Sequence, residues 1–87
     1  MNNLGYNLLR QGKKLEAIAI FKLNTEVYSA SANAYDSLAE AYLANHDSAH
    51  ARGCYEKVLA LLPASQYNAE FKSRLESTAK EKLKQLH

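Results

Sequence analysis

The chain has 87 residues, 47% of them apolar and 23% charged, and its formal net charge is +2. That length holds one domain, taken here as residues 1–87, and the composition is typical of a folded chain. Three Gly and one Pro are too few for an all-β protein with many tight turns, and the small net charge argues against a nucleic-acid or membrane surface.

The first half of the chain predicts two helices, over 2–11 and 14–28. Leu4 and Leu8 lie one helical turn apart, and Gly12 marks the turn that follows them. The second helix is indicated by apolar residues at helical spacing: Ala17, Ile18, Phe21 and Val27.

The next two helices, over 32–44 and 47–61, have the clearest periodicity. Apolar residues recur at i, i+3, i+4 and i+7 from Tyr35 to Tyr42, and at intervals of three or four residues from Ala51 to Leu62.

Polar residues and a proline predict where these helices begin and end. Ser31 and Asp47 are typical N-caps, and Asn45 tolerates the left-handed backbone of a turn. Pro63 cannot continue a helix, so the fourth helix is expected to end near it.

A fifth helix is predicted over 67–86 by an apolar stripe along one face: Phe71, Leu75, Ala79, Leu83 and Leu86. The other face is charged, with five Lys or Arg and three Asp or Glu in residues 64–87. We interpret it as the solvated face of a helix that caps the fold. The alternative is an amphipathic helix that docks on a partner or on a membrane surface, which strong binding to anionic vesicles would favour.

The chain also repeats itself at an offset of 34 residues. The shift aligns small residues with small ones and large apolar residues with large apolar ones: Leu4 with Leu38, Gly5 with Ala39, Leu8 with Tyr42, Ala17 with Ala51 and Phe21 with Tyr55. Such self-similarity is typical of stacked helical hairpins, because a single hairpin cannot bury all of its apolar surface.

These positions resemble the tetratricopeptide repeat family. Its 34-residue unit has an aromatic residue, Leu-Gly and Tyr on the first helix, then a small residue, an aromatic, a second small residue and a closing Pro. The second unit carries the pattern at Tyr35, Leu38-Ala39, Tyr42, Ala51, Tyr55, Val58 and Pro63. The first carries it at Leu4-Gly5, Leu8, Ala17 and Phe21, with Asn24 at the second small position and Ser29 in place of Pro.

The resemblance covers roughly residues 1–65 and implies a right-handed stack of antiparallel helix hairpins, an all-α solenoid of about five helices. Repeat one spans 1–31 and is truncated at its start, repeat two spans 32–65, and a capping helix spans 66–87.

In that family the first helix of each unit lines a concave surface that binds extended peptides. The resemblance therefore places candidate partner-binding residues on the first and third predicted helices: Asn3, Tyr6, Arg10, Asn33, Asp36, Ser37 and Glu40. Members that capture a carboxylate have Lys and Arg here, whereas this chain has Asp36 and Glu40, which favours a basic or neutral peptide. The alternative is an ordinary solvated polar surface.

The chain has no arrangement of residues typical of catalysis. Cys54, the single cysteine, has no activating charge nearby and is expected to be a core residue. His46 and His50 have the i, i+4 spacing of a metal pair, but His46 falls in a turn and no further ligands accompany them. We expect no enzyme activity, no cofactor and no metal.

Two functions are consistent with the sequence. The first is a module that binds a protein or peptide, rather than nucleic acid or membrane, on the concave face. The second is a structural or self-assembling segment of a larger protein, because the stretches 21–24 and 35–38 resemble repeats at the ends of bacterial proteins that include serine-hydrolase-type enzymes.

Self-association is expected through an apolar surface left poorly covered in the first unit: Leu4, Leu8, Ile18 and Ile20. A single cysteine and the absence of a signal-peptide pattern suit a cytoplasmic location without deciding it.

Overall fold

The structure is a computed structural model that describes residues 3–86. It contains five α-helices and one short 3₁₀-helix: α1 (Asn3–Arg10), α2 (Lys14–Val27), α3 (Ala32–Ala44), α4 (Ser48–Leu61), η1 (Leu62–Ala64) and α5 (Ala69–Gln85). Residues 3–86 contain no strand, so the predicted all-α class is confirmed. Over the same residues, no helix combines the length and apolar character needed to span a bilayer.

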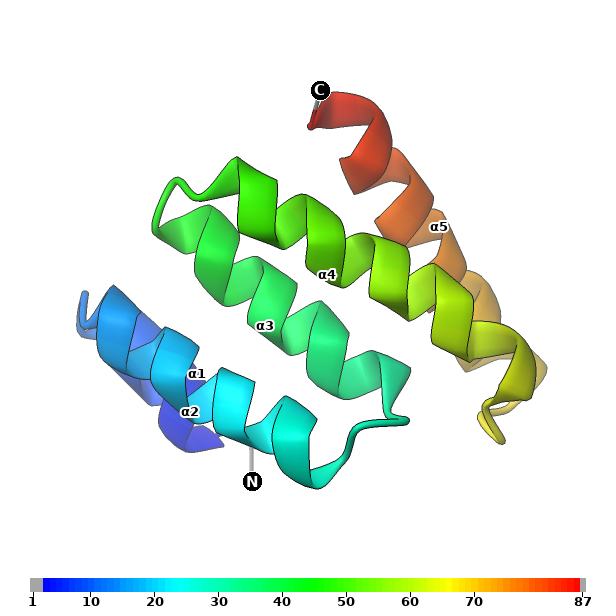
Figure 1. Cartoon of the computed structure of the whole chain (residues 1–87), viewed down its shortest axis with the longest axis horizontal. Coiled ribbons are helices and arrows are strands. Elements are labelled where there is room, and N and C mark those ends of the chain that lie inside the picture. Colours follow the sequence, from blue (N-terminus) through cyan, green and yellow to red (C-terminus); the bar gives the residue numbers. More distant parts are fainter. Residues whose placement is uncertain (1–2, 87) are drawn as a thin grey trace.

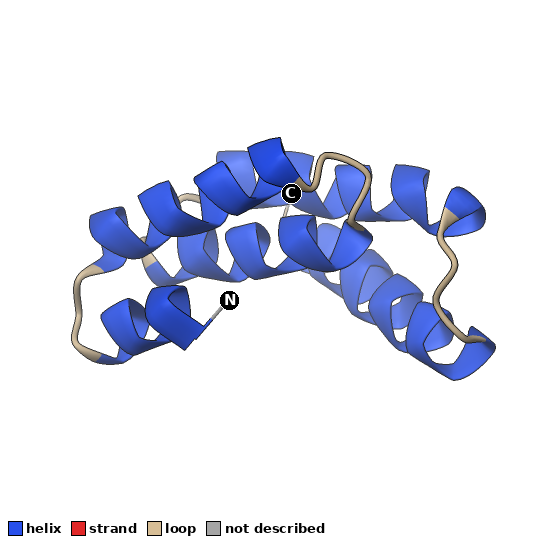
Figure 2. Ribbon diagram, turned by 90° about the horizontal axis from the view of Figure 1, so that it is seen from below, coloured by secondary structure: helices blue, strands red, loops and turns tan. Residues whose placement is uncertain are grey.

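The helices form two hairpins followed by a single helix (Figure 1). Helix α1 packs on α2 and α3 packs on α4, while α2 contacts α3 and α5 contacts α4. Figure 2 shows that the whole is an arch, with α1 beside the N-terminus at one foot and α5 at the other. Helix α3 also contacts α5, and in Figure 2 α1, α3 and α5 lie along the inner side of the arch.

Side-chain caps fix the starts of α3, α4 and α5. Ser31 and Asp47 are N-caps as predicted, because each side chain accepts a hydrogen bond at 3.2 Å from the backbone N–H three residues later. Helix α5 begins at Ala69, two residues later than predicted, because the Asn68 side chain accepts a hydrogen bond from the Phe71 N–H at 2.8 Å.

The two hairpin turns are built alike, although one prediction about them was wrong. In the first turn Gly12 has a left-handed backbone conformation, with a φ of 80°. In the second turn His46, 34 residues later, has the same conformation with a φ of 59°. We expected Asn45 to be the left-handed residue, but its φ is −94°. Its N–H still bonds the Ala41 carbonyl as in a helix, so the chain turns one residue later.

The buried core runs through both hairpins into α5. Its members include many small residues around a few large ones: Ala17, Phe21, Ala32, Leu38, Ala39, Ala41, Ala51, Cys54, Tyr55, Val58, Leu62, Leu75 and Ala79. Helix α1 approaches α2 so closely at Gly5 that a Cβ there would lie 2.5 Å from the Phe21 ring. The glycine is therefore required by packing, and it does not mark a turn.

Coverage of the apolar surface is uneven. Leu4 is 56% exposed, whereas Leu38, its counterpart in the second hairpin, is only 5% exposed. The expectation that Leu4 stays uncovered is confirmed, but Leu8, Ile18 and Ile20 are half-buried.

A row of exposed apolar side chains along α2 was not predicted. Four exposed apolar residues recur at every fourth position of this helix: Leu15, Ala19, Leu23 and Val27. They begin two positions before the buried series Ala17, Phe21 and Thr25, which puts them on the opposite side of the helix. Helix α2 therefore has two apolar faces, of which one is buried in the core. We call Leu15, Ala19, Leu23 and Val27 the outer stripe.

Candidate functional site

Polar side chains from the first and third helices meet where α1 lies beside α3. The Tyr6 hydroxyl donates to Glu40 Oε2 at 2.7 Å and lies 3.0 Å from Ser37 Oγ. A phenol has one proton, so Ser37 is the donor to the Tyr6 oxygen while Tyr6 donates to Glu40. The Tyr6 ring packs edge-on against Phe21 at a centroid distance of 5.0 Å, which fixes the direction of its hydroxyl.

Asp36 lies one helical turn before Glu40 and has no partner for one oxygen. Its Oδ1 atom is buried and accepts no hydrogen bond within the described part of the chain. Neither Asp36 nor Glu40 forms an ion pair within residues 3–86. Burial, and after it the negative charge of Glu40, raises the pKa of Asp36 to about 6. The carboxyl group is thus mostly ionised at neutral pH despite being half-buried.

Sequence reasoning did not single out Tyr55 of α4, whose pKa is raised by burial and in part by the charges of Asp36 and Glu40. The side chain is completely buried, and its hydroxyl also has no hydrogen-bond partner. Burial raises the pKa of Tyr55, with further contributions from the charges of Asp36 and Glu40. We call Tyr6, Asp36, Ser37, Glu40 and Tyr55 the inner cluster.

A signal for Tyr55 was present in the sequence. The matching residue of the first hairpin is Phe21, which fills the same kind of core position without a hydroxyl. A tyrosine where phenylalanine suffices indicates a use for the extra oxygen, because a buried hydroxyl without a partner costs about 1–3 kcal/mol.

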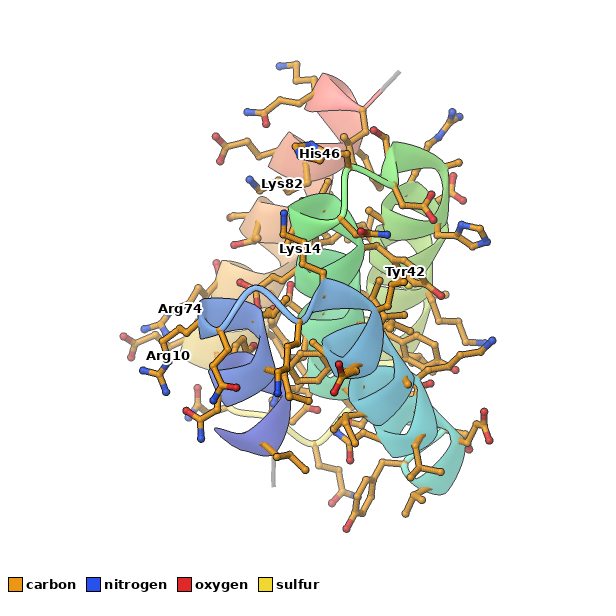
Figure 3. All side chains as sticks on the ribbon, turned by 90° about the vertical axis from the view of Figure 1, so that its left-hand side faces the viewer. Arg10, Lys14, Tyr42, His46, Arg74 and Lys82 are labelled. Atoms are coloured by element: carbon orange, nitrogen blue, oxygen red, sulfur yellow. The ribbon has the colours of Figure 1, made fainter. Side chains whose placement is uncertain are left out.

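The remaining predicted site residues do not join the inner cluster. Arg10 is exposed and its guanidinium bonds the Asn7 side chain on its own helix. Figure 3 shows Arg10 extending from the ribbon on the side where α1 lies, with Tyr42 on the opposite side. The backbone N–H of Asn33 bonds the Tyr67 hydroxyl at 3.3 Å. The side chain of Asn3 lies outside the described part of the structure.

A second group of reactive side chains lies between α3 and α4, on the side of Tyr42. His50 Nδ1 is 2.7 Å from Asp47 Oδ2, and the imidazole stacks on the Tyr42 ring at 5.0 Å. Cys54 is buried beside them. Burial, followed by the charge of Asp47, raises the pKa of the Cys54 thiol to about 11, so the sulfur is protonated and a poor nucleophile at neutral pH.

Within residues 3–86, no group of three or more His, Cys, Asp or Glu side chains converges on a point that could hold a metal ion. Comparisons with protein-family models, with curated proteins and with solved structures give no match to this chain. The inner cluster is therefore described by its own contacts: Tyr6 is hydrogen-bonded to Ser37 and Glu40, and Asp36 lies one turn before Glu40. The buried Tyr55 has a pKa that burial and then both carboxylates raise.

Proposed function

We propose that this chain is a non-catalytic helical-repeat module of the tetratricopeptide type, which binds a peptide segment of a partner protein along its inner side. The proposal includes a right-handed stacking of the two hairpins, capped by α5. The observation that carries it is the pair of carboxylates on α3, Asp36 and Glu40, which form no ion pair within residues 3–86 while Glu40 accepts a hydrogen bond from Tyr6 of α1.

The helices at this site support a shared binding surface. Tyr6 and Glu40 occupy matching places in the two units, 34 residues apart, and they hydrogen-bond to each other. The first helices of both units therefore both contribute polar side chains at this place, which suits an extended ligand that crosses both.

The charge of the site favours a basic or neutral peptide. Two carboxylates that pair with no cation of residues 3–86 repel an acidic segment and attract a positive one. Tyr6 adds a rigid aromatic contact with a polar tip, a combination typical of residues that anchor peptides.

A selection experiment with peptides displayed on phage tests the proposal. Twelve-residue peptides selected on the intact protein are expected to lose binding to Asp36→Lys and Tyr6→Ala, with the helical circular dichroism unchanged. Glu56→Lys makes the same charge change at an exposed position of α4 and should bind the peptides normally. Peptides that bind all four proteins equally would rule out this surface.

A second candidate function is self-assembly, as a structural segment of a larger protein. The outer stripe favours it, since Leu15, Leu23 and Val27 are among the most exposed large apolar side chains described. Under this hypothesis the partner is a second copy of the chain, and substitutions in the inner cluster leave its function unchanged. Substitutions at Leu23, or at the exposed Leu4, would change the oligomeric state.

A further inference from the structure

We propose that the outer stripe of one copy of this chain docks in the groove between α3 and α4 of a second copy. This inference rests on the self-assembly candidate, names the surface that receives α2, and does not involve the inner cluster.

The receiving surface is a groove of about 330 Å³ between the two helices of the second hairpin. Tyr35 and Tyr42 of α3 line one side of it, and Ala49 and Gly53 of α4 line the other. Tyr42 lies opposite to Arg10 in Figure 3, so the groove is on the side of the molecule away from that residue. We call it the α3–α4 groove.

The first argument is shape. A Cβ at Gly53 would have no neighbour within 4 Å, so the middle of α4 leaves open space in the groove, although alanine would be the better helix former there. Leu15, Leu23 and Val27 of the outer stripe are each more than half exposed. A row of protruding side chains on one helix fits a groove bordered by small residues on another.

The second argument is the balance of charge. Residues 15–27 contain two glutamates and one lysine, an excess of one negative charge. Residues 48–61, which form α4, contain one arginine, one lysine and one glutamate, an excess of one positive charge with His50 neutral. Contact between two outer stripes would bring surfaces of like charge together, whereas a stripe in a groove brings opposite charges together.

The charged residues that border the two surfaces are available for such a contact. Lys57 lines the groove, and it pairs with no carboxylate of residues 3–86. Its ammonium group lies 5.9 Å from the centre of the Tyr35 ring. Glu16 and Glu26 flank the two ends of the outer stripe, are exposed, and pair with no cation of residues 3–86.

A further hairpin stacked before α1 would not cover the outer stripe. The second hairpin already has α2 on one side and α5 on the other, yet its residues at the matching places, Ala49, Gly53 and Lys57, are exposed. Stacking in the manner of this chain therefore leaves this side of the second helices open. The stripe needs a partner that approaches from outside the stack, as a second copy does.

Two half-blocked variants provide the test, because each copy has one stripe and one groove. Leu23→Lys places a charge in the stripe and leaves the groove intact. Gly53→Glu places a charge in the groove and leaves the stripe intact. A Cβ at Gly53 meets no other atom, so this variant should fold, which helical circular dichroism checks. Ser73→Glu adds the same charge at an exposed position of α5 as the control.

We expect the unaltered chain and Ser73→Glu to associate at about 1 mM in sedimentation velocity, and each half-blocked variant alone to associate at least about tenfold more weakly. An equimolar mixture of the two variants should form a 1:1 heterodimer, because the stripe of one fits the groove of the other. Native mass spectrometry identifies the heterodimer from the two masses. Lys57→Glu should associate at least about threefold more weakly than the unaltered chain.

The outcomes separate this inference from the self-assembly candidate. Association of Gly53→Glu at the level of the unaltered chain, a mixture that forms no heterodimer, or indifference to Lys57→Glu would each overturn docking in the groove, while self-assembly would stand. An unaltered chain that is monomeric at about 1 mM would overturn both. The peptide-binding function is tested separately, with Asp36→Lys and Tyr6→Ala.

Discussion

The two hairpins of this protein have matching sequences but different surroundings. Leu4 and Leu38 occupy the same place in their hairpins, yet Leu4 is 56% exposed and Leu38 is 5% exposed. The α3–α4 hairpin has α2 on one side and α5 on the other, whereas α1–α2 is contacted mainly by α3. The burial of a leucine is thus decided by the neighbouring hairpin as much as by its own.

The outer surfaces of the second helices differ in composition as well. At the places of Leu15, Ala19 and Leu23 in α2, helix α4 has Ala49, Gly53 and Lys57. Both sets are exposed, so position alone does not explain the apolar character of α2. Only the first hairpin carries a row of exposed apolar side chains on that side, which suits contact with another protein.

The largest expected effect on stability comes from truncating Leu38, and the same truncation at its counterpart Leu4 provides the comparison. Leu38→Ala removes a buried side chain and leaves a cavity, so the free energy of unfolding should fall by about 2–4 kcal/mol. Leu4→Ala removes a mostly exposed side chain and should cost less than about 1 kcal/mol. Urea unfolding followed by circular dichroism measures both. Equal losses would mean that the two hairpins do not differ in coverage as described.

Smaller changes in stability, opposite in sign, are expected when two helical glycines are replaced by alanine. A Cβ at Gly5 would lie 2.5 Å from the Phe21 ring, whereas one at Gly53 would have no neighbour within 4 Å. Gly5→Ala should destabilise the fold by about 1–3 kcal/mol through overpacking. Gly53→Ala should stabilise it by about 0.5–1 kcal/mol, because alanine is the better helix former. Thermal unfolding of both variants gives the two signs, and a stabilising Gly5→Ala would contradict the close approach of α1 and α2.

Most of the helix pattern was predictable because it depends on local chemistry. The bounds of α3 were predicted to the residue, since Ser31 is a typical N-cap and the apolar spacing is regular. The start of α5 was missed by two residues because Asn68 caps the helix from a stretch that has no apolar period. The left-handed turn was placed at Asn45 by residue preference, but helical bonding of its N–H moved the turn to His46.

The site was predictable only in part. Four of its residues were predicted from their place in the repeat, and the structure brings them together: Tyr6, Asp36, Ser37 and Glu40. Tyr55 was assigned to packing because an aromatic residue is expected there, and only the three-dimensional packing reveals that its hydroxyl is unpaired. Exposure of the outer stripe was also missed, because a helix with two apolar faces does not indicate which face is buried.

The pH dependence of stability should report on the inner cluster. Burial, with Glu40 second, raises the pKa of Asp36 to about 6 from 3.8. The folded state therefore binds the proton more tightly than the unfolded state, and the stability that protonation confers is full below about pH 4 and lost as the pH rises through about 6.

Asp36→Asn should consequently stabilise the protein at pH 7.5, by about 1 kcal/mol after allowance for solvent screening of a half-buried carboxyl. The advantage should shrink as the pH falls toward 4. Urea unfolding at several pH values measures the difference, and Glu56→Gln serves as an exposed control. An Asn variant that is less stable at pH 7.5 would mean that the carboxylate has a favourable partner.

The smallest expected effect on stability comes from the outer stripe, where association should change instead. Leu23→Lys copies the residue that α4 has at Lys57, and because Leu23 is 57% exposed the free energy of unfolding should change by less than about 0.5 kcal/mol. If α2 packs against a second copy, a charge in the middle of that contact should prevent association.

Sedimentation velocity over a range of concentrations is expected to give self-association of the unaltered chain and a monomer for the variant. Ser73→Lys adds the same charge to α5 and should associate like the unaltered chain. A chain that is already monomeric at high concentration would contradict self-assembly and leave the apolar face of α2 for a different partner.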